Sequence, residues 1–466
     1  MLYEEHAFTP AWRLADLIKS KKLSPVELVD GLLERISALN PKLNAYLTVA
    51  EEDARASARE AEQSVMDGKD LHPLHGVPVS IKDMHQTKGL RTTFGSLIFK
   101  DNMPDQDEVP VSRLREAGAI ILGKTNTPEF GLSGSTENLL GEDCRNPWNM
   151  ERTSGGSSGG AAASVAAGLG PFGLGTDGAG SVRIPAGFCG VYGLKPTFGR
   201  TPVAGSPSFV VMGPISRTVR DAALMLDVIA GYDASDPNSI RESPPCFVDA
   251  LEGGIEGLAV AWSSDLGYAS VDPEVRAVGA SAALVFESLG CRVDESTPES
   301  GEPFSTHEVI QPANFYAGRG KFLHEHAEKL MPYVKQRLEE GEKIAGHEYA
   351  TALKAMTIYQ QRMDDFFERY DLLLVPSDAV PAFPVGQRPE KIDGQEVDWF
   401  WGPFPMTLPF NLTGQPVANV PCGYSSEGLP IGLQVIGRKG DEATVLRASA
   451  AFEHAQPWAQ DIPQLL

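Results

Sequence analysis

The N-terminal part of the chain has the spacing of apolar residues that is typical of helices. Apolar residues recur every three or four positions over residues 10–39, which predicts two helices, and a third helix is predicted at residues 51–66. The second helix has a clear start, because Ser24 can cap the first amide groups and Pro25 suits the first helical turn. Glu27 stands at capping-box distance from Ser24.

After residue 70 the pattern changes to short apolar runs separated by amphipathic stretches, which indicates strands alternating with helices. The predicted strands are residues 77–81, 119–122, 171–175, 191–194, 258–262, 291–293, 372–375, 417–421 and 431–436. The predicted helices are residues 108–117, 158–168, 217–230, 273–289 and 442–455, together with a largely helical, highly charged stretch near 301–370. Interleaved strands and helices predict an α/β fold with helices on both faces of one sheet.

The charge balance narrows the classes of partner. The formal net charge is −22, and no basic patch of the kind that binds nucleic acid is visible. The five cysteines are widely spaced without a CxxC pair, so neither a disulfide framework nor a metal site is expected. The first residues are acidic and include no apolar run, and the longest run of small apolar residues, 161–175, is too short for a bilayer. We expect a cytoplasmic protein without a membrane partner.

Glycines crowd into the region from residue 155 to residue 213, where a dinucleotide-binding loop is one possible interpretation. Two overlapping GxGxxG matches begin at Gly168 and Gly173. Such a loop should close a strand and open a helix. Pro171 lies inside the first match, and no helix is expected directly after the second, so this interpretation is disfavoured.

A hydrolase elbow is the second interpretation. GxSxG matches are centred on Ser157 and on Ser158. An elbow needs a buried strand that runs into the serine and a downstream acid and histidine. The preceding residues 146–152 are polar and predict a loop, and the downstream histidines lie mostly in charged helical segments. This interpretation is also disfavoured.

The third interpretation combines serines with Lys82, which follows the predicted strand 77–81 on its less apolar face. An exposed ammonium paired with Asp83 is the ordinary expectation for this position. A lysine buried beside hydroxyls, however, loses its proton readily because desolvation disfavours the charged form, and a neutral lysine can activate a serine. Consecutive backbone N–H groups could then surround an oxyanion, namely those of Gly178, Ala179, Gly180 and Ser181.

Several long segments, taken in order, resemble the amidase signature family over nearly the whole chain. These segments are HGVPVSIKD (75–83), GKTNTPEF (123–130), SGGSSGG (154–160), GTDGAGSVRIPA (175–186), GLKPTFGR (193–200), GQPV (414–417) and GLPIGLQVIG (428–437). The resemblance implies one domain, 1–466, with a central, twisted, mixed sheet covered by helices on both faces. Its parts would be N-terminal helices (1–70), a signature core (71–235) and the rest of the sheet with the helical insert (236–466).

The resemblance also implies a catalytic arrangement. Ser181 would be the acylated nucleophile, Lys82 the base, and Ser157 the bridge between them, with a cis peptide bond from Gly156. The backbone of residues 178–181 would form the oxyanion hole. The side chains that would fix these loops are Ser158, Asp177 and Arg183, although a purely structural ion pair is the alternative for the last two.

Ala179 is a departure from the family pattern, because members often have two glycines directly before the nucleophile. Only the backbone N–H is needed at this position, so the methyl group should be tolerated. It could narrow the acyl pocket.

The resemblance leaves the substrate open. A free-standing amidase is expected, because the segment 201–212 lacks the Ser-Ser-Leu-Asp-Gln run of tRNA amidotransferase subunits. Neither a cofactor nor a metal is expected. The alternatives are carbamate or ester hydrolysis, a non-catalytic binding protein, and the glutamine-hydrolysing subunit of a tRNA amidotransferase. The expected partner is a small-molecule amide, and a homodimer stays open.

The substrate pocket is expected near Gly131 and Leu132, with residues 386–398 as part of a lid. Candidate pocket aromatics are Phe209, Trp399, Trp401 and Phe404, each with ordinary packing as its alternative. Taken together, these aromatic residues favour a hydrophobic or aryl amide, anilide or carbamate.

Overall fold

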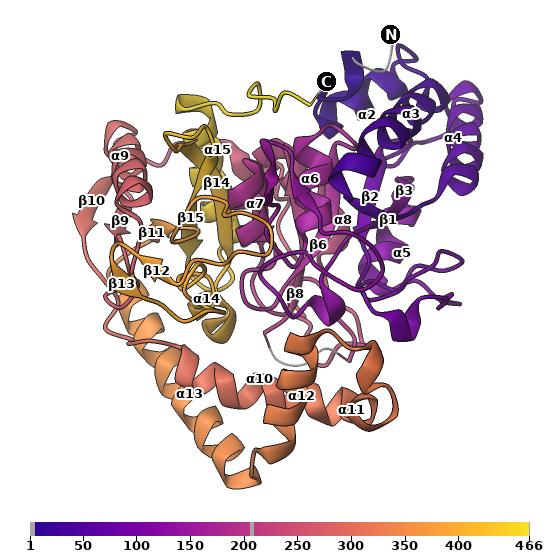
Figure 1. The fold of residues 1–466 in the computed structure, drawn as a ribbon. Coiled ribbons are helices and arrows are strands. Elements are labelled where there is room, and N and C mark those ends of the chain that lie inside the picture. Colours follow the sequence, from indigo (N-terminus) through magenta and orange to yellow (C-terminus); the bar gives the residue numbers. More distant parts are fainter. Residues whose placement is uncertain (1–4, 206–208, 466) are drawn as a thin grey trace.

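The computed structural model describes residues 5–205 and 209–465, and its centre is one large mixed sheet. Within these residues, eleven strands form the sheet in the order β1-β3-β2-β6-β8-β7-β14-β15-β11-β9-β10. The edge strand β1 is antiparallel to β3. Parallel pairs then join β3, β2 and β6 on one side and β11, β9 and β10 on the other, while the pairs between these two groups are antiparallel. The predicted α/β fold with one mixed sheet is confirmed (Figure 1).

The strands of this sheet are mostly short and buried. Their bounds are β1 Tyr46–Val49, β2 Pro78–Lys82, β3 Ile120–Thr125, β6 Phe172–Asp177, β7 Tyr192–Lys195, β8 Val211–Ser216, β9 Ala259–Trp262, β10 Arg292–Glu295, β11 Leu372–Pro376, β14 Val417–Tyr424 and β15 Pro430–Gly437. Two small hairpins lie outside the sheet: β4 Arg145–Asn146 with β5 Asn149–Thr153, and β12 Lys391–Ile392 with β13 Gln395–Glu396.

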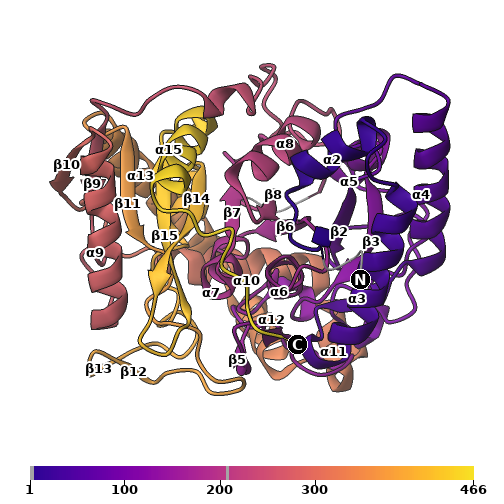
Figure 2. The same cartoon turned by 90° about the horizontal axis from the view of Figure 1, so that it is seen from above.

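Helices cover both faces of the sheet (Figure 2). One buried apolar cluster packs against helices α5 Val109–Glu116, α8 Val219–Ile229, α9 Pro273–Ser288 and α15 Glu442–Ala455. A second cluster packs against α3 Pro25–Leu43, α4 Glu51–Met66, α6 Gly159–Ala166 and α7 Arg183–Cys189. Strand β3 shows why two faces form, since Ile121 belongs to the first cluster while Ile120 and Leu122 belong to the second.

The predicted N-terminal helices and the helical insert are both present. Helices α2 Ala11–Lys19, α3 and α4 match the expected positions, and Ser24 accepts hydrogen bonds from the amides of Val26 and Glu27. The insert consists of α10 Phe304–Arg319, α11 Lys321–Glu325, α12 Pro332–Lys343 and α13 Gly346–Phe367, with α14 Pro409–Thr413 in the following segment. The insert forms a separate helical group at the bottom of Figure 1.

The structure also contains elements that the apolar pattern does not predict. Strand β1 is four residues long and lies at the sheet edge, where only one residue is fully buried. Strand β8 includes Gly213 and Pro214, which usually mark turns. Helix α7 is short and holds Pro185. In each case the surrounding tertiary structure overrides a weak local preference.

Candidate active site

Lys82 ends strand β2 on the sheet face that helix α6 covers. Its neighbours Val79 and Ile81 pack in the cluster on the opposite face, so alternation along the strand turns Lys82 toward α6. The side-chain nitrogen Nζ donates to Ser157 Oγ at 2.6 Å and to Thr176 Oγ1 at 2.7 Å. The lysine and Ser157, which are 75 positions apart in sequence, are therefore in direct contact.

Burial dominates the electrostatics of Lys82. The side chain is fully buried, and desolvation lowers its pKa well below the ordinary value, although the negative charge of Asp177 acts in the opposite direction. The ordinary expectation of an ion pair with Asp83 is wrong. The Asp83 carboxylate lies 3.8 Å from Lys124 Nζ and accepts a hydrogen bond from Thr93 Oγ1. Burial thus favours the neutral form of the Lys82 amine.

The glycine- and serine-rich segments lie against each other around this lysine. The Gly156–Ser157 peptide bond is cis, as expected. The Ser158 amide donates to the Ser181 carbonyl at 3.1 Å, and Ser158 Oγ donates to the Thr176 carbonyl at 3.2 Å. Ser181 is half-buried, and within the described part of the chain its hydroxyl makes no hydrogen bond.

Asp177 holds the backbone on both sides of Ser181. One carboxylate oxygen accepts from the Gly180 amide at 2.7 Å, and the other accepts from the Val182 amide at 3.2 Å. Arg183 donates to both oxygens at 2.9 Å. Burial alone would raise the pKa of Asp177, but the charge and hydrogen bonds of Arg183 lower it below the ordinary value, so the carboxylate is ionised.

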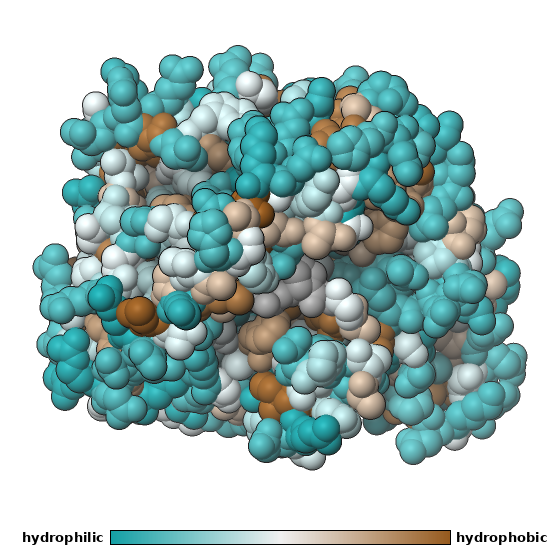
Figure 3. Space-filling model, turned by 90° about the horizontal axis from the view of Figure 1, so that it is seen from below, coloured by the Kyte–Doolittle hydropathy of each residue, from teal (hydrophilic) through white to brown (hydrophobic). Residues whose placement is uncertain are grey.

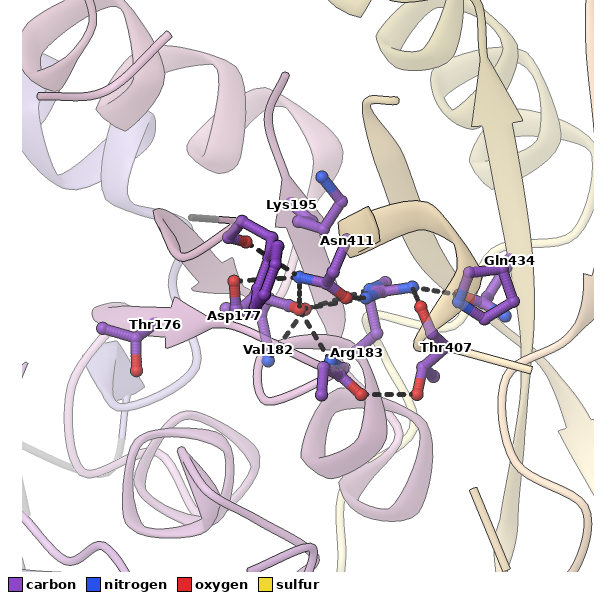
Figure 4. A network of polar contacts seen from close by, with 12 residues as sticks. Thr176, Asp177, Val182, Arg183, Lys195, Thr407, Asn411 and Gln434 are labelled. Carbon is purple, nitrogen blue, oxygen red and sulfur yellow. Dashed lines mark hydrogen bonds and ion pairs between the residues drawn. The ribbon is translucent and has the colours of Figure 1, made fainter. Parts of the chain in front are cut away.

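Arg183 is itself fully buried and uses its remaining N–H groups on neutral oxygens (Figure 4). Its partners are the carbonyl of Thr407 at 2.8 Å, Gln434 Oε1 at 2.7 Å and Asn411 Oδ1 at 2.6 Å. These residues come from α14, the segment before it and strand β15. The pair therefore ties the segment around Ser181 to the C-terminal half of the sheet.

The backbone donors expected for an oxyanion hole are not equivalent. The N–H of Gly180 is already occupied by Asp177. The N–H groups of Gly178, Ala179 and Ser181 make no hydrogen bond within the described residues. Among the described residues, three of the four expected donors thus have no acceptor, whereas the N–H of Gly180 has one.

Of the two expected pocket residues, Gly131 lies next to the lysine–serine pair. A Cβ atom built on Gly131 would lie 3.3 Å from Ser157 Oγ and 3.7 Å from Met84 Cε. Leu132 is half-buried and packs on an aromatic cluster that includes Phe130 and Phe315.

The candidate pocket aromatics separate into different environments. Phe209 and Trp401 belong to an apolar cluster that also contacts Ala179, two residues before Ser181. Phe404 packs in another cluster with Phe383 and with Ile184, which follows Ser181 by three residues. Trp399 is 53% exposed, and the Arg388 guanidinium lies over its ring. Three of the four candidate aromatics, Phe209, Trp401 and Phe404, thus lie in clusters that include a residue close in sequence to Ser181.

A cleft of about 500 Å³ lies beside this apolar cluster. Its walls come from the helical insert, the segment 396–405 and residues 268–270, and they include Phe304, Phe400 and Trp401 as well as Glu308 and Arg337. Seen from below, pale and brown residues gather across the middle of the surface between teal borders (Figure 3).

Four residues of the site were missed by the sequence interpretation: Thr176, Thr407, Asn411 and Gln434. Thr176 and Gln434 lie inside segments that resemble the family, which was the available signal. The contact of Thr176 with Lys82 and the contacts of the other three residues with Arg183 need the folded sheet.

The structure also bears on the two disfavoured interpretations. Gly173 and Gly175 lie inside strand β6, so they cannot form a phosphate-binding turn. A helix, α7, does open shortly after this strand, which the sequence interpretation did not expect. Strand β5 precedes Ser157 where a loop was predicted, but it belongs to a hairpin outside the central sheet.

Among the residues that the structure describes, no group of three or more histidine, cysteine, aspartate or glutamate side chains could hold a metal ion. No helix there is long and apolar enough to cross a membrane.

Comparison with known proteins gives matches over nearly the whole chain. The family model described as Amidase matches residues 27–446. An acylamidase of Rhodococcus erythropolis is 41% identical over 465 residues, which cover 97% of this chain and 96% of that protein. A glutamyl-tRNA(Gln) amidotransferase subunit of Geobacillus thermodenitrificans (strain NG80-2) is 39% identical over 484 residues, which cover 97% and 98%. The crystal structure of a bacterial aryl acylamidase of the amidase signature family superposes with a TM-score of 0.91 at 32% identity, covering 97% of each chain.

Proposed function

We propose, given that this chain belongs to the amidase family, that Ser181, Ser157 and Lys82 carry out its reaction. The chain is an amidase, an enzyme that hydrolyses amide C–N bonds. The observation that carries the proposed mechanism is the buried contact of Lys82 Nζ with Ser157 Oγ, which joins a desolvated amine to the segment packed against Ser181.

In the proposed acylation step, Ser181 Oγ attacks the substrate carbonyl and gives its proton to Ser157 Oγ. Ser157 in turn passes its own proton to the neutral amine of Lys82. The proton then returns by the same route to the leaving nitrogen as the C–N bond breaks, which leaves the acyl group on Ser181. Water hydrolyses this ester with the same base and releases the acid.

Charge development on the substrate oxygen needs donors that are already in place. The free N–H groups of Gly178, Ala179 and Ser181 are the proposed oxyanion hole, without Gly180. Asp177, supported by Arg183, would keep these donors in position because it binds the amides on both sides of Ser181. Ser158 would align the Ser181 segment with strand β6 through its bonds to residues 176 and 181.

The proposed substrate is an amide with a hydrophobic or aryl group, such as an anilide. Support comes from the apolar cluster of Phe209 and Trp401 at Ala179, and from the aromatic walls of the neighbouring cleft. The acylamidase and aryl acylamidase relatives are consistent with this class. We infer no glutaminase role from the amidotransferase relatives, because the segment 201–212 lacks their typical run.

The compartment and the assembly stay predictions. The five cysteines are all free, which supports a reducing compartment such as the cytoplasm. A homodimer remains an open proposal, as does the absence of a nucleic-acid partner.

The mechanism is tested by intact-protein mass spectrometry after reaction with a fluorophosphonate that reacts with nucleophilic serines. Wild type should gain one adduct that maps to Ser181, and Ser181→Ala should gain none. Lys82→Ala should label at least ~10²-fold more slowly, since a positioned base contributes about that much or more. Ser80→Ala is the matched control, because Ser80 lies two residues before Lys82 on the same buried strand. An adduct on Ser157 or Ser158 that survives in Ser181→Ala would refute the assignment.

A further inference from the structure

The loop of residues 129–137 packs directly on the peptide bond between Gly156 and Ser157. A Cβ atom built on Gly156 would lie 2.7 Å from the Ser133 carbonyl and 2.9 Å from the Ser135 amide. The same loop carries Gly131, beside Ser157 Oγ. A shift of this loop would therefore change the space next to the proposed catalytic serines.

The hydroxyl of Tyr333, on helix α12 of the insert, bridges the two ends of this loop. It accepts a hydrogen bond from the Glu129 amide at 2.9 Å and donates one to the Glu137 carbonyl at 3.2 Å. Burial raises the pKa of Tyr333 well above its ordinary value, so the hydroxyl keeps the proton that this arrangement requires. The amide of Met331, two residues earlier, also binds the Glu129 carboxylate, at 2.6 Å.

A second contact comes from Arg388, in the segment predicted to form a substrate lid. Its guanidinium donates to Ser133 Oγ at 2.6 Å and lies 3.8 Å from the Glu137 carboxylate. The arginine side chain is only 4% exposed and lies over the ring of Trp399. The helical insert and the 386–398 segment thus both bind the same loop, on residues other than Gly131 and Leu132.

We propose that Tyr333 and Arg388 are positioning residues that fix the 129–137 loop against Gly156 and Ser157, and thereby set which amides fit beside Gly131 and Leu132. This inference rests on the proposed function, because it assumes that the reaction occurs at these serines. Neither side chain contacts the reacting atoms. They act through the loop, so their loss should alter selectivity more than the chemical step.

Tyr333→Phe is the sharpest variant, because it removes one oxygen and keeps the aromatic ring in its cluster. Tyr316→Phe is the matched control: its ring packs on the same cluster, but its hydroxyl binds Glu342 rather than the loop. Arg388→Gln tests the second contact independently. Activity is measured on four substrates, the acetyl and hexanoyl amides of ammonia and of 4-nitroaniline.

The readout is the ratio of kcat/KM values between substrates, which does not depend on the fraction of enzyme that is folded. Tyr333→Phe and Arg388→Gln should each change at least one ratio by about five- to tenfold, mainly through KM, since an unsatisfied buried group costs about as much as a tenfold change in affinity. Tyr316→Phe should leave every ratio unchanged.

A changed acyl ratio places the loop beside the acyl group, and a changed amine ratio places it beside the leaving group. Unchanged ratios in both variants would overturn the proposal. Fluorophosphonate labelling of Ser181 in the same preparations separates this failure from failure of the proposed mechanism, in which case wild type itself would not be labelled there.

Discussion

Replacement of Asp177 by asparagine tests how the segment around Ser181 is held. The carboxylate accepts hydrogen bonds from the Gly180 and Val182 amides and from Arg183, and both charged side chains are fully buried. An asparagine of the same shape presents an NH₂ group where one carboxylate oxygen now accepts. It also leaves the Arg183 charge with only neutral partners.

The expected cost can be estimated from this arrangement. Breaking a buried ion pair by removing one partner costs about 3–5 kcal/mol, because the remaining charge stays buried. With an unfolding entropy of about 2.1 cal/mol/K per residue, a chain of 466 residues has about 1 kcal/mol/K in total. Asp177→Asn should therefore lower the thermal midpoint by about 3–5 °C.

The assay is thermal unfolding at pH 7 together with the rate of Ser181 labelling by fluorophosphonate. Labelling should slow by at least ~10-fold, because the amides of Gly180 and Val182 would lose a charged acceptor and the backbone around Ser181 would be held less firmly. Asp177 is ionised in the folded state because its pKa lies below the ordinary value, so its contribution is present at pH 7 and lost as the pH falls through that lowered pKa.

Asp221→Asn is the matched control, because Asp221 is also fully buried but lacks an ion pair at salt-bridge distance within the described residues. Burial raises its pKa to about 6, so its ionised form destabilises the folded state above that pH. The midpoint of Asp221→Asn at pH 7 should be unchanged or higher. Equal losses in the two variants, or an Asp177→Asn protein with wild-type midpoint and labelling rate, would refute the reasoning.

Two further predictions concern the proposed base and the backbone beside the nucleophile. Burial lowers the pKa of Lys82, and the neutral amine is the proposed active form, so kcat/KM for an anilide should fall as the pH falls through a value well below about 10.4. This acidic fall in kcat/KM should be absent in Lys82→Ala. If the fall persists in the variant, it belongs to another group. Gly180→Ala should reduce Ser181 labelling at least ~10-fold, because Gly180 has φ +117° and an added Cβ would lie 2.3 Å from Thr407 Oγ1. Gly178→Ala should label faster than Gly180→Ala, because among the described residues its Cβ would contact Val210 alone, at 3.1 Å. The reverse order would contradict the steric argument.

The sequence by itself determined much of the chemistry, because the relevant residues lie in short segments with distinctive order. The apolar alternation that ends at Lys82, the cap at Ser24 and the glycine- and serine-rich segments could each be recognised locally. The helical insert was also predictable, since long amphipathic helices repeat one period over several turns. The short elements β1, β8 and α7 were not, because their few residues leave too little pattern to distinguish a strand or helix from a loop.

Only the tertiary structure decided how these segments meet. The partners of Arg183 in the C-terminal half are Thr407, Asn411 and Gln434, between 224 and 251 positions away in sequence. The contact of Asp177 with the Gly180 N–H is local, since it spans three positions, but the ion pair with Arg183 depends on the distant residues that hold the guanidinium in place. The environment of Lys82 has the same origin: its low pKa follows from burial, and burial is a property of the packed sheet and helices rather than of the strand that carries the lysine.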